Sequence, residues 1–154
     1  MFQLARISVD TSVIIEYIDR KGELHEQAEA VFSAILAGKL EAVIPHPILA
    51  ETYYVASRIY QELGIEDSEA TATKLVEWLY RLPTVTIADT SLDLALEAGR
   101  IKLYYKLALT DCYVLAASRI YDCTALFKRP EKEILENLKE IKKNYRVIFL
   151  KDYM

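Results

Sequence analysis

The chain has 154 residues, 53% of them hydrophobic and 27% charged, which fits one domain over residues 1–154 with a substantial core. Its net charge of −4 argues against a protein that binds nucleic acid through a broad basic surface. No apolar run approaches the roughly 20 residues of a membrane helix, and the N-terminus does not resemble a secretion signal. Cys112 and Cys123 lie in apolar segments, so we expect two reduced, buried thiols in a cytoplasmic protein with no membrane segment.

Short β-rich runs alternate with longer amphipathic segments along the chain. Strands are predicted at about 5–9, 42–44, 85–88, 124–127 and 147–150. Apolar residues at helical spacing predict helices that begin near 11, 23, 48, 67, 91, 111 and 130. Thr90-Ser91-Leu92-Asp93 resembles a capping box for the fifth of these helices, and the last is expected to run unbroken to about Lys143. Strands alternating with helices imply right-handed crossovers, so we expect an α/β fold whose parallel sheet of about five strands is covered on both faces.

Asp10 directly follows the first predicted strand and precedes Thr11 and Ser12. This places its carboxylate at the carboxyl edge of a central strand, where open α/β sheets bind their ligands. Asp10 could instead cap the helix that follows. Thr11 and Ser12 also offer caps for that helix, so we interpret Asp10 as a candidate ligand.

Two further acids lie on apolar helix faces. Glu51 shares a stripe with Ile48 and Val55, and an unpaired buried carboxylate there would cost several kcal/mol or take up a proton. A salt bridge to Arg58 is the alternative explanation for Glu51. Asp111 continues the apolar face of its own helix, where the helix dipole alone could favour it, although Thr110 already offers a cap.

Carboxylates gathered at the ends of several parallel strands repel one another unless a cation lies between them. A set of ligands made only of oxygen atoms favours hard ions such as Mg²⁺ or Mn²⁺. Such ions activate a bound water and neutralise charge on a phosphate, which are the requirements of phosphodiester cleavage. The three acids therefore point towards a metal-dependent site.

Three short motifs resemble those of PIN-domain ribonucleases, most closely the archaeal VapC-type toxins of toxin–antitoxin pairs. They are Asp10-Thr11-Ser12, Ala50-Glu51-Thr52 and Thr110-Asp111-Cys112, in the family's order and spacing. The resemblance implies a three-layer α/β/α fold with a central parallel sheet. It also implies an endoribonuclease that binds Mg²⁺ or Mn²⁺ through Asp10, Glu51 and Asp111, with Thr11, Ser12 and Thr110 as accessory hydroxyl groups.

The fourth acid of the family motif is missing at its usual place, where this chain has Pro130. Glu131 is the expected substitute and Glu133 the reserve candidate. Both acids could instead simply favour the start of a helix after Pro130. If they do, the metal site is weakened and cleavage is slow or altered.

The resemblance further implies cleavage by a metal-activated water, products with a 5′-phosphate and a 3′-hydroxyl, a homodimer, and inhibition by a cognate antitoxin. Tyr53-Tyr54 and Tyr104-Tyr105 are candidate contact surfaces, although core packing would explain such aromatic pairs equally well. Basic side chains near the acids could guide RNA or could be ordinary solvated residues. They are Arg100, Lys102, Lys106, Lys128, Arg129 and Lys132. His46 could carry protons or could be a turn residue.

Two other functions compete with the nuclease hypothesis. A PIN module that has lost its activity and acts as a protein- or RNA-binding scaffold would explain Pro130, but it would not need a buried acid cluster. A phosphoaspartate phosphatase or receiver domain also places an aspartate after a parallel strand. The phosphatase needs a second aspartate at position 12, where this chain has Ser12, and the receiver needs an acidic neighbour that Asp10 lacks.

Overall fold

The computed structural model of the chain describes residues 4–89 and 91–154. Its centre is a five-stranded, entirely parallel sheet in the order β3-β2-β1-β4-β5. The strands are β1 (Ala5–Val9), β2 (Leu40–Pro45), β3 (Val85–Ala88), β4 (Thr124–Phe127) and β5 (Val147–Phe149). Because both faces of the sheet are covered, the central strands are apolar on both sides rather than alternating.

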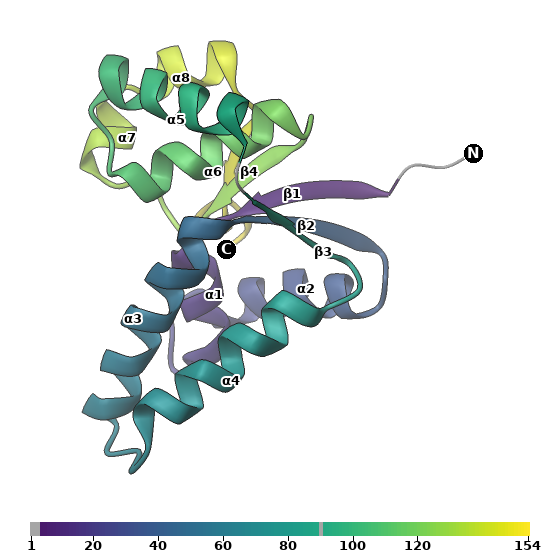
Figure 1. Cartoon of the computed structure of the whole chain (residues 1–154), viewed down its shortest axis with the longest axis vertical. Helices are drawn as coiled ribbons and strands as arrows, with labels where there is room; N and C mark the ends of the chain where they lie inside the picture. The colour runs from purple at the N-terminus through teal and green to yellow at the C-terminus, as the bar shows by residue number, and fades with distance from the viewer. Residues whose placement is uncertain (1–3, 90) are drawn as a thin grey trace.

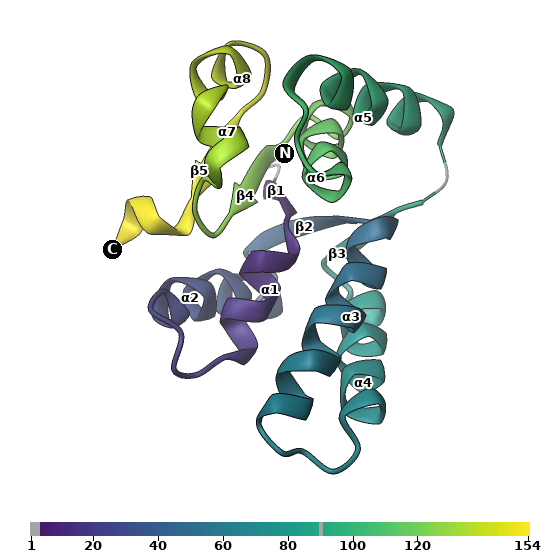
Figure 2. The same ribbon diagram turned by 90° about the vertical axis from the view of Figure 1, so that its left-hand side faces the viewer.

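Helices cover the two faces of the sheet as separate groups (Figure 1, Figure 2). One face carries α1 (Thr11–Ile18), α2 (His25–Leu36), α3 (His46–Glu62) and α4 (Ser68–Arg81). The other carries α5 (Leu92–Tyr105), α6 (Leu109–Ile120), α7 (Lys132–Glu136) and α8 (Leu138–Asn144), and a short 3₁₀ helix, η1 (Leu150–Tyr153), follows β5. The predicted three-layer α/β/α fold is therefore confirmed.

The order in which the chain adds strands to the sheet reverses between β1 and β4. From β1 it moves outward through β2 to β3, and it then returns to the other side of β1 to form β4 and β5. The backbone N–H of Asp10 donates to the carbonyl of Leu126 at 3.1 Å, which joins the ends of β1 and β4. Such a reversal leaves a crevice at the carboxyl ends of the two strands, where ligands bind in open α/β sheets.

The predicted boundaries agree closely with the structure for β1, β3 and β4, and differ in two instructive places. Strand β2 is longer than predicted, since it continues to Pro45 and α3 begins at His46 with Pro47 in its first turn. The predicted helix from Pro130 to Lys143 is two helices, because Asn137 interrupts it. The side-chain amide of Asn137 donates to the carbonyls of Tyr105 (3.2 Å) and Glu133 (2.8 Å), which fixes the break.

The predicted capping box before α5 is found in part. Ser91 caps the helix, its hydroxyl accepting from the N–H of Leu94 at 3.3 Å, while Thr90 lies outside the described residues. Cys112 and Cys123 are free thiols buried in the core. Within residues 4–89 and 91–154, the helices are too short or too polar to cross a membrane.

Candidate active site

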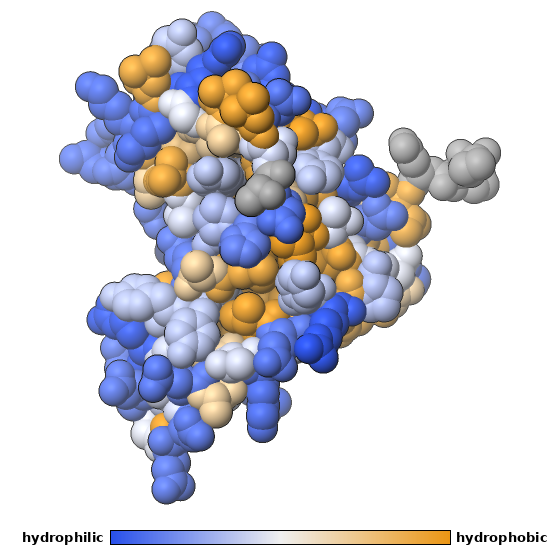
Figure 3. Space-filling view, in the orientation of Figure 1, coloured by the Kyte–Doolittle hydropathy of each residue, from blue (hydrophilic) through white to orange (hydrophobic). Residues whose placement is uncertain are grey.

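A cavity of about 330 Å³ opens at the carboxyl edge of the sheet, between the helices of the two faces. Figure 2 looks towards this edge, and the left-hand outline in Figure 3 is hollowed where the two groups of helices meet. Acidic and hydroxyl side chains from α1, α3, α6 and the loop after β4 line the cavity. They include Asp10, Thr11, Ser12, Glu51, Thr110, Asp111 and Glu131. Segments far apart in the sequence thus bring their acids to one place.

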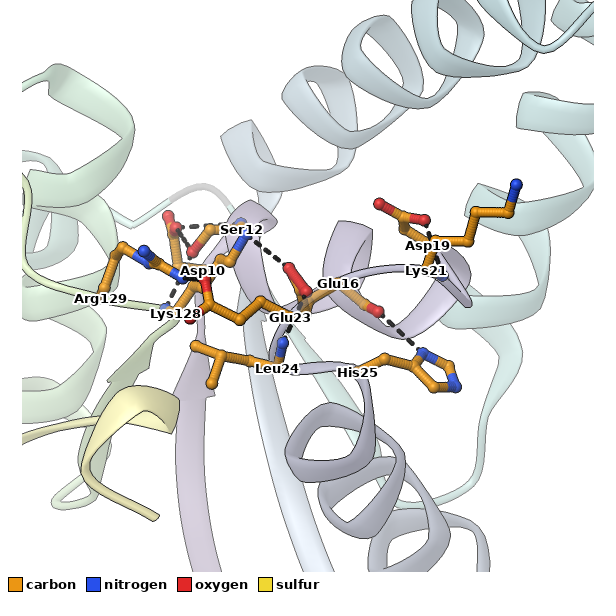
Figure 4. Close-up of polar contacts among 10 residues, drawn as sticks. All are labelled: Asp10, Ser12, Glu16, Asp19, Lys21, Glu23, Leu24, His25, Lys128 and Arg129. Carbon is orange, nitrogen blue, oxygen red and sulfur yellow. Dashed lines mark hydrogen bonds and ion pairs between the residues drawn. The ribbon is translucent and has the colours of Figure 1, made fainter. Parts of the chain in front are cut away.

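Asp10 is itself the cap of α1, so the expectation that Thr11 or Ser12 caps this helix is wrong. Its carboxylate Oδ2 accepts from the backbone N–H of Ser12 at 3.0 Å and from the Ser12 hydroxyl at 2.5 Å (Figure 4). Asp10 is only 6% exposed, yet it lines the cavity. Capping and ligand binding are compatible here, because a carboxylate has two oxygens and about four acceptor positions.

Glu51 lies in the second turn of α3 and points towards α6. Its Oε2 accepts a hydrogen bond of 2.9 Å from the hydroxyl of Thr110. Arg58, the alternative partner, donates instead to the hydroxyl of Tyr54 at 3.2 Å. Thr110 does not cap α6, since the helix begins at Leu109 after Ala108. The hydroxyl of Thr110 therefore orients the carboxylate of Glu51 and does not cap α6.

Glu131 is the fourth acid of the predicted site, and it directly precedes α7. It occupies the N-cap position, but its side chain makes no capping bond and instead lines the cavity beside Asp111. Glu133 lies in the first turn of α7, and its charge is felt by Asp111 although it does not line the cavity. Position 131 is thus closer to the other acids than position 133.

Burial, together with repulsion between neighbouring carboxylates, raises the pKa of two acids in the cavity. Burial raises the pKa of Asp10 to about 6, although the hydrogen bonds from Ser12 oppose the shift. Burial also raises the pKa of Asp111 to about 8, and the negative charges of Asp10, Glu131, Glu51 and Glu133 add to that effect. A cation among these carboxylates would remove the repulsion and return their pKa values towards normal.

The donor set fits a hard divalent ion, since it consists of oxygen atoms and its carboxylates repel one another. The hydroxyl of Thr11 is buried beside the cavity and has no partner among the described residues. Within that part of the chain, however, no three acidic, histidine or cysteine side chains already converge closely enough to hold an ion. Metal binding therefore requires rotation of side chains, for which Glu131 is exposed enough.

Sequence reasoning missed Glu16 as a residue of the site and did not separate Lys128 from the other basic residues nearby. Both side chains line the cavity. Glu16 is buried in α1, and its Oε2 lies 2.6 Å from the Nζ atom of Lys128 (Figure 4). The signal for Glu16 is present in the sequence, because an acid on the apolar side of α1 requires a partner just as Glu51 does.

Other predicted contributors lie elsewhere or have structural partners. His46 is exposed at the start of α3 and lines a separate cavity with Tyr113, so it does not reach the acids. Lys102 donates to the carbonyl of Leu107 at 2.7 Å, and Arg129 pairs with Glu23 at 2.9 Å. Of the tyrosine pairs, Tyr54 and Tyr104 are exposed while Tyr53 and Tyr105 are half-buried.

The order of the strands, the two helix layers and the acid-lined crevice define a class of α/β proteins. Comparison of the sequence with known families identifies that class. The chain belongs to the PIN domain family, which it matches over residues 7–132. No curated protein sequence matches it.

Solved structures of toxin–antitoxin proteins share the fold. One is VapBC2 from Rickettsia felis bound to a DNA fragment from its promoter, with a TM-score of 0.63 and 12% identity over 94% of this chain and 98% of that one. VapBC-1 from nontypeable Haemophilus influenzae has a TM-score of 0.61 and 14% identity over 95% and 98% of the two chains. The Mycobacterium tuberculosis toxin VapC20, which cleaves the sarcin-ricin loop, has a TM-score of 0.59 and 18% identity over 77% and 86%.

Proposed function

We propose that this chain is a metal-dependent endoribonuclease, the VapC-type toxin of a toxin–antitoxin pair. The observation that supports this most directly is the acid-lined cavity. In a PIN-domain chain, Asp10, Glu51, Asp111 and Glu131 share one cavity at the carboxyl edge of the sheet. The similarity of fold to VapC20, an RNA-cleaving toxin, supports RNA as the substrate class.

Mg²⁺ or Mn²⁺ would be held by Asp10, Glu51 and Asp111, with Glu131 as the fourth ligand. When bound, the ion supplies Lewis acidity towards a phosphodiester and a water of lowered pKa. Ser12 holds the carboxylate of Asp10 in place through two hydrogen bonds, and Thr110 orients that of Glu51. Cleavage would leave a 5′-phosphate and a 3′-hydroxyl.

We also propose a cognate antitoxin as the protein partner, a homodimer as the assembly and the cytoplasm as the location. The antitoxin is supported by the similarity of fold to proteins solved as VapBC complexes. A cytoplasmic location suits an RNA substrate and two free thiols.

A PIN module without catalytic activity, acting as a protein- or RNA-binding scaffold, is the second candidate. Two observations favour it. Pro130 stands at the usual place of the fourth acid, and among the described residues no three ligands already converge. Against it, the burial of Asp111 among other carboxylates, which raises its pKa to about 8, destabilises the fold and serves no purpose in a scaffold.

Cleavage of a panel of RNAs by the purified chain tests the proposal. We expect cleavage with Mn²⁺ or Mg²⁺, none with EDTA, and a loss of at least about 100-fold in Asp10→Asn because a ligand is removed. Asp93→Asn is the matched control, since it removes an exposed acid from the first turn of α5 and should cleave normally. If the wild-type chain cleaves no RNA with any divalent ion, the scaffold is favoured.

A further inference from the structure

Glu16 and Lys128 form an ion pair at the inner wall of the acid-lined cavity. The Glu16 side chain is 3% exposed, and both of its oxygens have partners. Its Oε1 accepts from the backbone N–H of Leu24 at 3.1 Å, and its Oε2 pairs with the Nζ atom of Lys128 at 2.6 Å. A carboxylate buried to this extent is stable only with such partners, so the position of the ammonium group is well defined.

The backbone of Lys128 is fixed as well. Its N–H donates to the hydroxyl of Ser12 at 3.1 Å, and that hydroxyl donates to Asp10 at 2.5 Å (Figure 4). The backbone of Lys128 is therefore linked to Asp10 through the hydroxyl of Ser12, and its ammonium group is held by Glu16. It lies at the crevice between β1 and β4, where the sheet order reverses.

The backbone leaves room for this pair at Gly22. A Cβ atom at position 22 would overlap Oε1 of Glu16, so any other residue there would displace the carboxylate. Gly22 and the hydrogen bond from Leu24 hold the buried carboxylate of Glu16 in one position. That carboxylate in turn fixes the ammonium group of Lys128.

A purely structural ion pair would not need to face the cavity. The Lys128 side chain is 30% exposed and lines the cavity together with Asp10 and Glu131. An ammonium group has three N–H donors, and the pair with Glu16 leaves two for other acceptors. The neighbouring Arg129 also lines a cavity with Asp10 and Asp111, but its partner Glu23 is exposed, so its charged group is held less firmly than that of Lys128.

A polyanion approaching this cavity meets several carboxylates and needs a positive charge beside them. We propose that Lys128 binds a phosphate group of the RNA backbone next to the acid cluster, and that Glu16 is the positioning residue that aims it. This proposal rests on the ribonuclease function proposed above. It singles out Lys128 from the other basic residues near the site.

Binding of RNA in the absence of cleavage tests the role of Lys128. The probe is a fluorescent single-stranded RNA with 2′-O-methyl groups, titrated by anisotropy with EDTA present at several salt concentrations. For Lys128→Met we expect about tenfold weaker binding and a salt slope shallower by about 0.7, the value for one phosphate contact on a single strand. Lys128→Arg should retain most of the affinity.

The matched control is Lys143→Met, which removes an exposed lysine paired with Glu140 on α8. It should change neither the affinity nor the slope. Since Lys128→Met leaves Glu16 buried without its partner, the double variant Glu16→Gln, Lys128→Met is measured in parallel, because it removes that unpaired charge. Thermal unfolding of each variant verifies that it is folded.

The positioning role of Glu16 predicts a change in kcat rather than in KM. In Glu16→Gln we expect kcat to fall at least about tenfold with KM within about threefold, because a misplaced contact costs rate more than binding. In the Lys128→Met background the same change should have no further effect. An unchanged kcat in Glu16→Gln would overturn the positioning role.

Wild-type affinity and salt slope in both Lys128→Met and the double variant, with cleavage intact in the unmodified chain, would overturn the proposal and leave the ribonuclease function standing. If the unmodified chain neither binds nor cleaves RNA, the proposed function itself fails, and the proposal for Lys128 fails with it.

Discussion

The carboxylates of the cavity show that one residue can serve local structure and chemistry at once. Asp10 caps α1 through Ser12 and still faces the cavity. Glu51 is oriented by Thr110, a residue on a different helix. Asp10 and Glu51 are each held by a hydroxyl group that donates without adding positive charge, and the repulsion between the carboxylates therefore remains.

The burial of these acids and the repulsion between them make the metal-free protein less stable as the pH rises. The folded-state pKa of Asp111, about 8, is above its ordinary value of 3.8, so between these values the folded state holds a proton that the unfolded state has lost. The free energy of unfolding should then fall as the pH rises from about 4 to 8, and Asp10 should contribute to the fall up to about pH 6.

Asp111→Asn should remove the part of this pH dependence that comes from Asp111. In EDTA at pH 8 the variant should melt above the wild type, by about 2–4 °C for each kcal/mol gained when the buried charge and its repulsion are removed. Thermal unfolding followed by circular dichroism at pH 4.5, 6 and 8 measures the effect. Parallel pH profiles for the two proteins would show that the charged form of Asp111 is not destabilised in the folded state.

At the scale of elements, the turn between α1 and α2 is built around the carboxylate of Glu16. The N–H of Leu24, at the start of α2, donates to Oε1 of Glu16, and Gly22 leaves space for that oxygen. The turn thereby connects the packing of α1 and α2 with the ammonium group of Lys128 in the cavity.

Gly22→Ala should destabilise the protein by about 1–3 kcal/mol, because the added methyl group displaces a buried carboxylate from its partners. Lys21→Ala is the matched control. Lys21 lies in the same turn with an exposed side chain, so this change should alter the free energy of unfolding by no more than about 0.5 kcal/mol. Urea denaturation of both variants measures these changes, and equal stabilities for the two would contradict the assignment of the turn.

At the scale of the whole molecule, α5 presents an exposed apolar stripe. Leu92, Leu96 and Leu103 are 73%, 62% and 72% exposed, and Gly99 lies between them at helical spacing. Large apolar side chains at such spacing commonly mark a surface that another protein covers. The open space beside Gly99 would let a second helix approach closely, which suits the proposed homodimer.

Leu96→Glu combined with Leu103→Glu should convert the proposed homodimer into a monomer, because two negative charges on each subunit would face each other across the interface. Light scattering after size-exclusion chromatography measures the mass. Leu36→Glu, which alters a similarly exposed leucine at the end of α2, should leave the dimer intact. A wild-type chain that is already monomeric, or a double variant that stays dimeric, would rule out this surface.

Much of the fold could be predicted because its signals are local. The spans of β1, β3 and β4 follow from short apolar runs bounded by turn residues, and the alternation of strands with helices implies the parallel sheet. The acids of the site could be singled out in the same way, since Glu51 and Asp111 interrupt apolar helix faces. Asn137 shows the limit, because the carbonyl of Tyr105 that helps to fix the helix break is distant in sequence.

The sequence by itself determined which elements form and which acids need partners, because spacing and burial pattern are properties of each segment. Only the tertiary structure decided which residues those partners are. The bond from Thr110 to Glu51 joins residues 59 positions apart, and the bond from Lys128 to Ser12 spans 116 positions. The pair of Glu16 with Lys128 likewise depends on β1 lying beside β4, since contacts between distant segments are set by the order of the strands.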